Sequence, residues 1–169
     1  MFRRIEDFLD MWKHETTFSL KLMDAIPDTA LGQAVSSEHR DLRRLAWHIT
    51  ESAVEMPSGL GIQVAAFPGE PYKTAPPATM KEIRDTYASV AADVAAGAAR
   101  LNAMALAMTY PFYGMTWTGA FALQVCLLHQ AHHRGQMTVL MRQAGLAVPG
   151  TFGPSKEEWG GWGMPAPEV

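Results

Sequence analysis

Four long stretches of the sequence repeat apolar residues at steps of three and four, the period that places side chains along one face of an α-helix. This spacing predicts long helices near residues 2–26, 42–56, 79–104 and 118–144. No stretch alternates apolar and polar residues in the way that a half-buried β-strand does. The sequence therefore predicts an all-α fold, a four-helix bundle, and its 169 residues suit one domain spanning 1–169.

Residues that start and stop helices lie at the ends of these stretches. Ser36 and Ser37 come before the second stretch, where a serine hydroxyl can accept a hydrogen bond from a free backbone N–H group. Thr79 and Glu82 have the spacing of a capping box at the start of the third stretch. Gly145 follows the fourth stretch and predicts a left-handed C-terminal cap. Local chemistry and periodicity thus predict the same helix boundaries.

Two glycines interrupt the third and fourth stretches. Gly97 lies between the apolar residues Val94 and Leu101, and Gly135 lies in the middle of the fourth stretch. A glycine inside a helix costs about 1 kcal/mol relative to alanine. We therefore expect Gly97 to let a neighbouring helix come close, and Gly135 to let another segment of backbone do so.

Two segments fall outside the helical pattern. Residues 57–78 are rich in proline and glycine and are too numerous for a simple turn between two helices. This long crossover between the second and third helices has two interpretations, a lid over a functional site or a surface connection. The second segment is the tail from Pro149 onward, which carries Phe152, Trp159 and Trp162. We expect the tail to lie extended on the bundle.

Charge and cysteine content exclude several classes of protein. The net charge is −3 and the basic residues are scattered, so nothing predicts a surface for nucleic acid or an anionic membrane. Cys126 is the single cysteine, which makes an intramolecular disulfide impossible. The first residues lack the apolar core of a signal peptide, and no segment has 18 uninterrupted apolar residues. We therefore expect a cytoplasmic protein with no nucleic-acid or membrane partner.

Two histidines lie on the inward face of the fourth predicted helix. At about 100° per residue, His129 and His133 point in the same direction as Cys126 and Met137. Buried imidazoles need hydrogen-bond partners or a metal ion, and side chains one turn apart can share an ion. An H-x-x-x-H spacing alone therefore leaves two interpretations open, a hydrogen-bonded core pair and a metal site.

His48 provides a third candidate ligand, because it lies on the shoulder of the second helix's apolar stripe. Three histidines would leave coordination positions open, which is typical of reactive metal sites. His132 also lies near His129, but it points toward a neighbouring interface or the surroundings of the site, and we rank it below His133. His14 and His39 lie among charged residues, and we expect both to be solvated.

Further residues near these histidines have candidate roles. Gln136 could bond a ligand imidazole, and Glu51, Tyr110 and Tyr113 are candidates to face an open coordination position. Solvation at the surface is the preferred interpretation for Glu51 and Glu55, and the alternative is that either orients His48 or acts as a base on metal-bound water. Cys126 is either a soft ligand or a small core residue. We expect Arg134 at the edge of its helix in an ordinary salt bridge.

The motif H-x-x-x-H-R-G-Q at residues 129–136 resembles the signature of the DinB/YfiT-like family of metal-binding four-helix bundles. The segments 45–49 (LAWHI) and 150–159 (GTFGPSKEEW) are similar to two further parts of that family's pattern. The resemblance implies that His48, His129 and His133 form the metal site and that the protein is a homodimer. It implies no role in DNA binding.

Three functions fit these observations. The first is a metal-dependent hydrolase or thiol S-transferase that acts on an unidentified small molecule at an open three-histidine site. The second is a non-catalytic metal-binding or stress-related protein, in which the ion is structural or shapes a ligand pocket. The third is a helical interaction module with no metal. Imidazole ligands suit several divalent ions, and we expect nickel or zinc.

Overall fold

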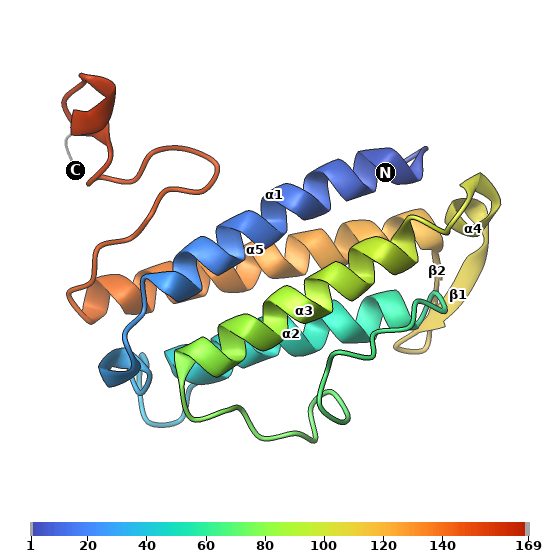
Figure 1. Ribbon diagram of the computed structural model, residues 1–169, viewed down its shortest axis with the longest axis horizontal. Helices are drawn as coiled ribbons and strands as arrows, with labels where there is room; N and C mark the ends of the chain where they lie inside the picture. Colours follow the sequence, from blue (N-terminus) through green and yellow to red (C-terminus); the bar gives the residue numbers. More distant parts are fainter. Residues whose placement is uncertain (1, 168–169) are drawn as a thin grey trace.

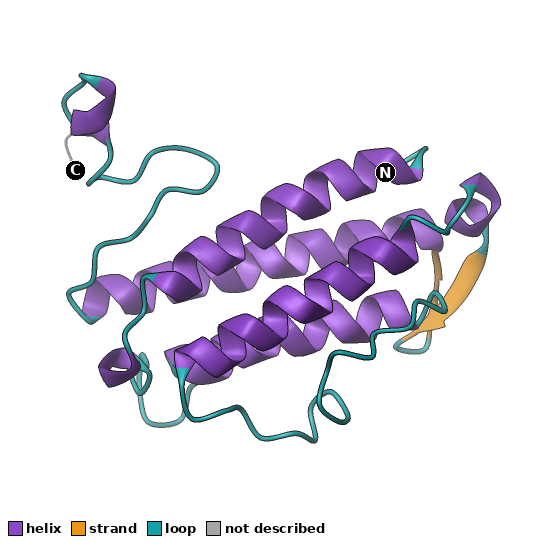
Figure 2. Cartoon of the chain, in the orientation of Figure 1, coloured by secondary structure: helices purple, strands orange, loops and turns teal. Residues whose placement is uncertain are grey.

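The computed structural model describes residues 2–167, and four long helices packed side by side dominate it (Figures 1 and 2). The helices form a closed ring in which α1 contacts α3, α3 contacts α2, α2 contacts α5 and α5 contacts α1. Their bounds confirm the predicted bundle: α1 (Ile5–Asp24), α2 (Leu42–Ser58), α3 (Met80–Ala98) and α5 (Gly119–Gln143). Among the described residues, no helix is long and apolar enough to cross a bilayer.

The caps of three helices test the predicted boundaries. Thr79 and Glu82 form the predicted capping box at the start of α3, and Gly145 has the predicted left-handed conformation after α5. The prediction for α2 was wrong, because Asp41 caps it by accepting a hydrogen bond from the Arg44 amide at 2.7 Å. A carboxylate directly before the first helical residue caps better than serines several residues away. Helix α2 also continues past the predicted stop to Ser58.

A short β-hairpin and a short helix replace the predicted continuation of the third helix. Helix α3 ends at Ala98, α4 covers Ala103–Ala107, and strands β1 (Thr109–Phe112) and β2 (Met115–Thr118) pair antiparallel. The sequence analysis predicted no strand. Tyr113 and Gly114 form the two-residue turn with φ of 52° and 75°, a conformation that asparagine, aspartate or glycine usually signals. Because tyrosine occupies the first turn position, the usual residue signal for a hairpin is missing.

The two helical glycines differ in what surrounds them. A Cβ atom on Gly97 would lie 2.3 Å from Cγ2 of Ile62, so the close neighbour is a side chain of the crossover and not the predicted helix. A Cβ atom on Gly135 would meet nothing within 4 Å, so no segment within residues 2–167 packs against it. The prediction of a packing role for Gly135 within the chain was therefore wrong.

A buried polar network crosses the bundle interior. Arg134 is 3% exposed and its Nη1 lies 2.5 Å from Oε2 of Glu15, which is 2% exposed. Arg134 also donates to Ser19 Oγ at 3.2 Å, and Gln130 one turn earlier donates to the Ile49 carbonyl at 2.9 Å. Arg134 does form a salt bridge, but in the core rather than at the predicted edge of the helix. This network ties α1 and α2 to α5.

The crossover after α2 packs against the bundle and is not merely a surface connection. Leu60, Ile62 and Phe67 are buried in the common core. The Trp47 indole donates to the Thr74 carbonyl at 3.0 Å, and the Ala66 amide donates to Asp93 at 2.9 Å. The crossover therefore has a fixed position beside α2, where the histidines also lie.

The C-terminal tail contacts the bundle only in part. Phe152 packs edge-on against Phe18 of α1 with ring centroids 5.0 Å apart, and Glu158 accepts a hydrogen bond from Lys21 at 2.9 Å. The last turn, η2 (Trp159–Trp162), lies away from the helices in Figure 1, and Trp162 is exposed. The prediction of a tail lying extended along the bundle holds for its first part alone.

Candidate metal centre

Three imidazole rings converge where α2 packs on α5. His48 projects from α2, and His129 and His133 project from successive turns of α5. The Nε2 atom of His129 lies 3.1 Å from Nε2 of His48 and 3.1 Å from Nε2 of His133. One ring nitrogen from each of the three lies within 4.8 Å of the other two. The structure thus brings together the three residues that the sequence analysis selected.

The spacing of these nitrogens fits a shared divalent ion. Imidazole nitrogens bind transition metals at about 2.0–2.1 Å, so two such ligands at about 90–110° to each other lie roughly 3.0–3.4 Å apart. The two separations of 3.1 Å fall in this range. In the tautomer that carries the proton on Nδ1, nitrogens this close present lone pairs to one another, which a cation between them relieves. The donor set and its spacing therefore suit a metal ion.

Hydrogen bonds around His133 orient its ring for coordination. Its Nδ1 lies 2.7 Å from Oε1 of Gln136, which can only accept, so Nδ1 carries the proton and Nε2 keeps its lone pair. The Gln136 amide nitrogen in turn lies 3.2 Å from Nε2 of His132. His132 is exposed and stands outside the cluster of three. Gln136 thus takes the predicted supporting role, and His132 supports Gln136.

A buried carboxylate lies behind His48. Glu51 is fully buried, and its Oε2 is 3.9 Å from Nδ1 of His48, too far for a direct hydrogen bond. Nδ1 itself is buried and has no hydrogen-bond partner among the described residues. Glu51 accepts hydrogen bonds from Arg44 at 2.6 Å and from the Tyr72 amide at 2.9 Å. The preferred interpretation of Glu51 as a solvated surface residue was therefore wrong, since this buried residue joins the crossover to α2.

Tyr72 of the crossover covers one side of the site, and the sequence analysis missed it. Its ring centroid lies 5.6 Å from that of His48, and its hydroxyl donates to Glu55 at 2.5 Å. Tyr72 has a φ of 66°, a strained conformation for a residue with a side chain, and the bonds to Glu51 and Glu55 hold it there. The crossover therefore contributes to the site, and only the unusual length of this loop could have signalled it.

Two other tyrosines were candidates for the open side of the site. Tyr113 is 59% exposed, and partial burial together with Glu55 raises its pKa to about 12. Tyr110 instead donates to the Ala105 carbonyl at 3.3 Å and closes the end of the hairpin. Burial raises the pKa of the Cys126 thiol to about 12, and Cys126 lies outside the histidine cluster. Glu55 is linked to the site through the Tyr72 hydroxyl, whereas Cys126 is a small core residue.

Burial keeps the three rings neutral. It is the main reason that the pKa of His48 falls to about 3 and that of His133 to about 4, and the positive charge of Arg40 lowers both further. Burial also lowers the pKa of His129. Only neutral imidazole can bind a metal, so at neutral pH all three rings are in the form that coordination needs.

Comparisons with known proteins identify the family and the fold. Residues 1–165 match the DinB family. The chain is 36% identical over 170 residues to the uncharacterised protein YrdA of Bacillus subtilis (strain 168), and the match covers 100% of both chains. A DinB-like protein from Bacillus cereus ATCC 10987 has a similar solved structure, with a TM-score of 0.82, 37% identity, and coverage of 90% of this chain and 100% of that one.

A second solved structure shares the fold at lower identity. The DinB-like protein YjoA from Bacillus subtilis has a TM-score of 0.66 and 18% identity, with coverage of 82% of this chain and 92% of that chain. At this level of identity the likeness to YjoA shows the fold alone.

Proposed function

The chain belongs to the DinB family, and we propose that His48, His129 and His133 bind one divalent transition-metal ion. The observation that carries this proposal is the convergence of three neutral Nε2 atoms with separations of 3.1 Å along the cluster. A hydrogen-bonded core trio is a poorer explanation. Because Nε2 of His133 can only accept, the single Nε2 proton of a neutral His129 would have to serve both His133 and His48 at 3.1 Å. Nickel or zinc suits an all-imidazole set.

We propose that the site acts on a small molecule, as a metal-dependent hydrolase or a thiol S-transferase. Three protein ligands leave coordination positions open, and a divalent ion there supplies Lewis acidity and lowers the pKa of what it binds. The chain places Tyr72 beside His48 and Glu55 on the Tyr72 hydroxyl, and Glu55 also influences Tyr113. Burial and Glu55 raise the pKa of both tyrosines, so their hydroxyls stay protonated. The Tyr72 hydroxyl gives its proton to Glu55, and its oxygen can still accept a hydrogen bond from a bound ligand.

A non-catalytic role is the second candidate, and one observation favours it. The carboxylates nearest to the histidines already have partners within the chain, since Glu51 bonds Arg44 and Tyr72, and Glu55 bonds the Tyr72 hydroxyl. A general base needs a free oxygen to accept a proton from its substrate. In this alternative the ion stabilises the contact between α2 and α5 and shapes a ligand pocket. The cytoplasm is the compartment that we propose for either role.

Elemental analysis of the purified, untagged protein tests the metal site. We expect about one ion per chain in the wild type, and loss of the ion in His48→Ala, His129→Ala and His133→Ala. His132→Ala is the matched control, because His132 lies on the same helix but outside the cluster, and it should keep the ion. A wild type that holds no ion after loading with zinc or nickel would leave the helical interaction module as the explanation.

A second pair of measurements separates the two candidate functions. Removal of the ion with a chelator should lower the melting temperature in both cases, because the ion joins α2 to α5. An enzyme should in addition hydrolyse an ester or transfer a thiol in a substrate screen, and Tyr113→Phe should change that rate while metal content stays the same. No turnover in the metal-loaded protein across such a screen would favour the non-catalytic role.

A further inference from the structure

The segment just before α2 presents a positive charge, that of Arg40. Arg44, one turn later, pairs with Glu51 at 2.6 Å, but no carboxylate within residues 2–167 forms an ion pair with Arg40. The Arg40 side chain is exposed. An unpaired arginine at the surface is ordinarily solvated by water alone, so its role depends on what lies beside it.

The charge of Arg40 lies close to the histidine cluster. It lowers the pKa of His48, His129 and His133, although these rings come from two helices. On His48 its effect exceeds that of Arg44, which lies one turn away in the same helix as His48. Because the interaction between two charges weakens with distance, the guanidinium of Arg40 lies near the place where the three rings meet.

A groove of about 470 Å³ lies between Arg40 and helix α5. Leu45 and Leu140 line it and are 3% and 2% exposed, so the groove has an apolar floor. Gln136 also lines the groove, and its side-chain oxygen accepts from Nδ1 of His133. The groove therefore extends from beside a metal ligand to an unpaired positive charge. Its volume is in the range of sites for small organic molecules, about 300–1,000 Å³.

We propose that this groove binds the substrate of the three-histidine site, and that the substrate is a small organic carboxylate with an apolar body. Its carboxylate would bind Arg40, since a guanidinium and a carboxylate form paired, charge-assisted hydrogen bonds. Its body would lie on Leu45 and Leu140, which places the other end of the molecule beside Gln136 and His133. This substrate class rests on the proposed function, because it describes the molecule on which the metal site acts.

The charges around the groove suit a single negative charge. Among the described residues that line it, Arg40 is the one basic side chain besides His39, whose Nδ1 already lies 2.6 Å from the Ser36 hydroxyl. Glu38 lines the groove as well and would repel a second negative charge. A carboxylate therefore fits better than a phosphate group, which carries nearly two negative charges at neutral pH.

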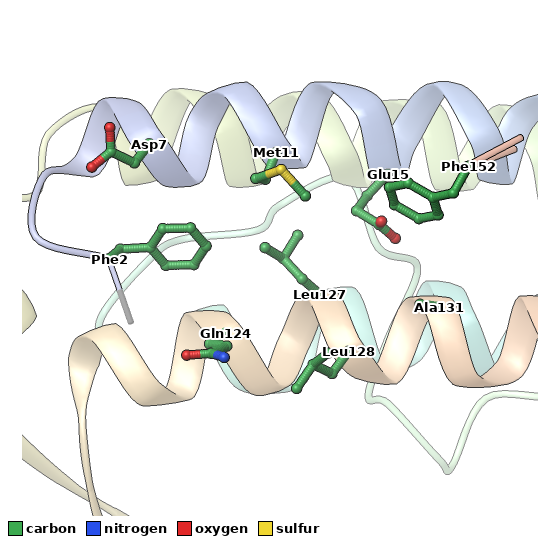
Figure 3. A pocket seen from close by; sticks show the side chains of 9 residues that line it. All are labelled: Phe2, Asp7, Met11, Glu15, Gln124, Leu127, Leu128, Ala131 and Phe152. Atoms are coloured by element: carbon green, nitrogen blue, oxygen red, sulfur yellow. The ribbon is translucent and has the colours of Figure 1, made fainter.

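A second groove, of about 410 Å³ between α1 and α5, has the opposite charge (Figure 3). Met11 and Leu127 point toward each other across it, and Asp7 and Glu15 are its charged residues. None of the residues labelled in Figure 3 is basic. An organic anion should therefore avoid this groove, whereas a ligand held only by its apolar body would enter both.

Nuclear magnetic resonance titrations of the zinc-loaded, full chain test the substrate class. The probes share one pentyl chain: hexanoate carries one negative charge, hexanamide carries none, and pentyl phosphate carries two at about pH 8. We expect hexanoate to bind at least about 10-fold more tightly than hexanamide, and more tightly than pentyl phosphate. Equal affinities for hexanoate and hexanamide would overturn the proposal, and tighter binding of pentyl phosphate would overturn the choice of a carboxylate.

Two arginine variants test the contact itself. Arg40→Gln should lower the affinity for hexanoate by about 10-fold and leave that for hexanamide unchanged. Arg43→Gln is the matched control, because it removes the same charge from a residue that does not line the groove, and it should keep the wild-type affinities. Zinc-loaded protein in which Arg40→Gln leaves the hexanoate affinity unchanged would overturn the proposal.

The same titrations show where the probe binds. Hexanoate should shift the backbone amide signals of Gln136 and Val139, which line the groove beside Arg40. Shifts at Met11 and Leu127 instead would place the probe in the groove of Figure 3 and would overturn the proposal. Elemental analysis of each sample reads the metal site separately, so a chain that holds no zinc contradicts the proposed function and not the contact between Arg40 and the carboxylate.

Discussion

The Nδ1 atom of His133 lies 2.7 Å from the side-chain oxygen of Gln136, one turn further along α5. This contact fixes which nitrogen of His133 carries the proton, and it therefore directs the lone pair of Nε2 toward His129 and His48. Gln136, which is not itself a ligand, thus holds His133 in the form that can bind a metal ion. Loss of such a supporting hydrogen bond commonly lowers metal affinity by about 10–100-fold.

Replacement of Gln136 should weaken metal binding while the three histidines remain. We expect Gln136→Leu to lower zinc affinity by about 10–100-fold, measured by isothermal titration calorimetry, because the His133 ring loses its acceptor. Gln136→Glu keeps an acceptor and should retain the affinity. Gln143→Leu changes an exposed glutamine on the same helix and serves as the control. Equal affinities in all four proteins would show that Gln136 does not orient the ligand.

The stability of the metal-free protein should depend on pH through its buried histidines. Burial lowers the pKa of His48 to about 3 and that of His133 to about 4, whereas an unfolded chain has histidine pKa values of about 6.5. Between these values the unfolded state binds more protons than the folded state, so the free energy of unfolding falls as pH drops from about 6.5 toward 4. Above about 6.5 this contribution is complete.

Urea denaturation in the presence of chelator, repeated across this pH range, measures the effect. His133→Ala should flatten the dependence, and His14→Ala should not, because His14 is exposed. A slope that His133→Ala leaves as steep as in the wild type would assign the acid sensitivity to other groups.

The buried ion pair between Glu15 and Arg134 should be costly to break and cheap to replace. Glu15→Leu leaves the Arg134 guanidinium buried without its partner, and we expect a loss of about 3–5 kcal/mol in the free energy of unfolding. The double variant Glu15→Leu with Arg134→Met removes both charges and should recover most of that loss. Urea titration of the two variants beside the wild type checks the prediction. A double variant no more stable than the single one would contradict it.

Gly97→Ala should destabilise the protein although alanine is the better helix former. The added Cβ would lie 2.3 Å from Cγ2 of Ile62, and overpacking of this kind costs about 1–3 kcal/mol, more than the roughly 1 kcal/mol gained in helix propensity. Thermal unfolding of Gly97→Ala in the wild type and in an Ile62→Ala background tests the cause. The substitution should cost less in the second background, because the clashing methyl group is absent.

Local sequence patterns were sufficient for the bundle and for its helix ends where the signal is a near neighbour. The capping box of Thr79 and Glu82 and the left-handed Gly145 needed only residues within one turn. The hairpin was missed because Tyr113 occupies a turn position where the usual residues would have signalled it. The predicted third helix extended too far, because the apolar spacing continues past Ala98, where the chain turns.

The directions of His48, His129 and His133 were also decided by the sequence, because helical geometry sets the face on which each side chain lies. Only the tertiary structure could decide what meets them: Tyr72 of the crossover beside His48, the burial of Glu51, and the pairing of Arg134 with Glu15. Periodicity reports the direction of a side chain relative to its own helix. Which residue from elsewhere in the chain lies opposite depends on how the helices pack and on the path of the loops, and no local pattern contains that information.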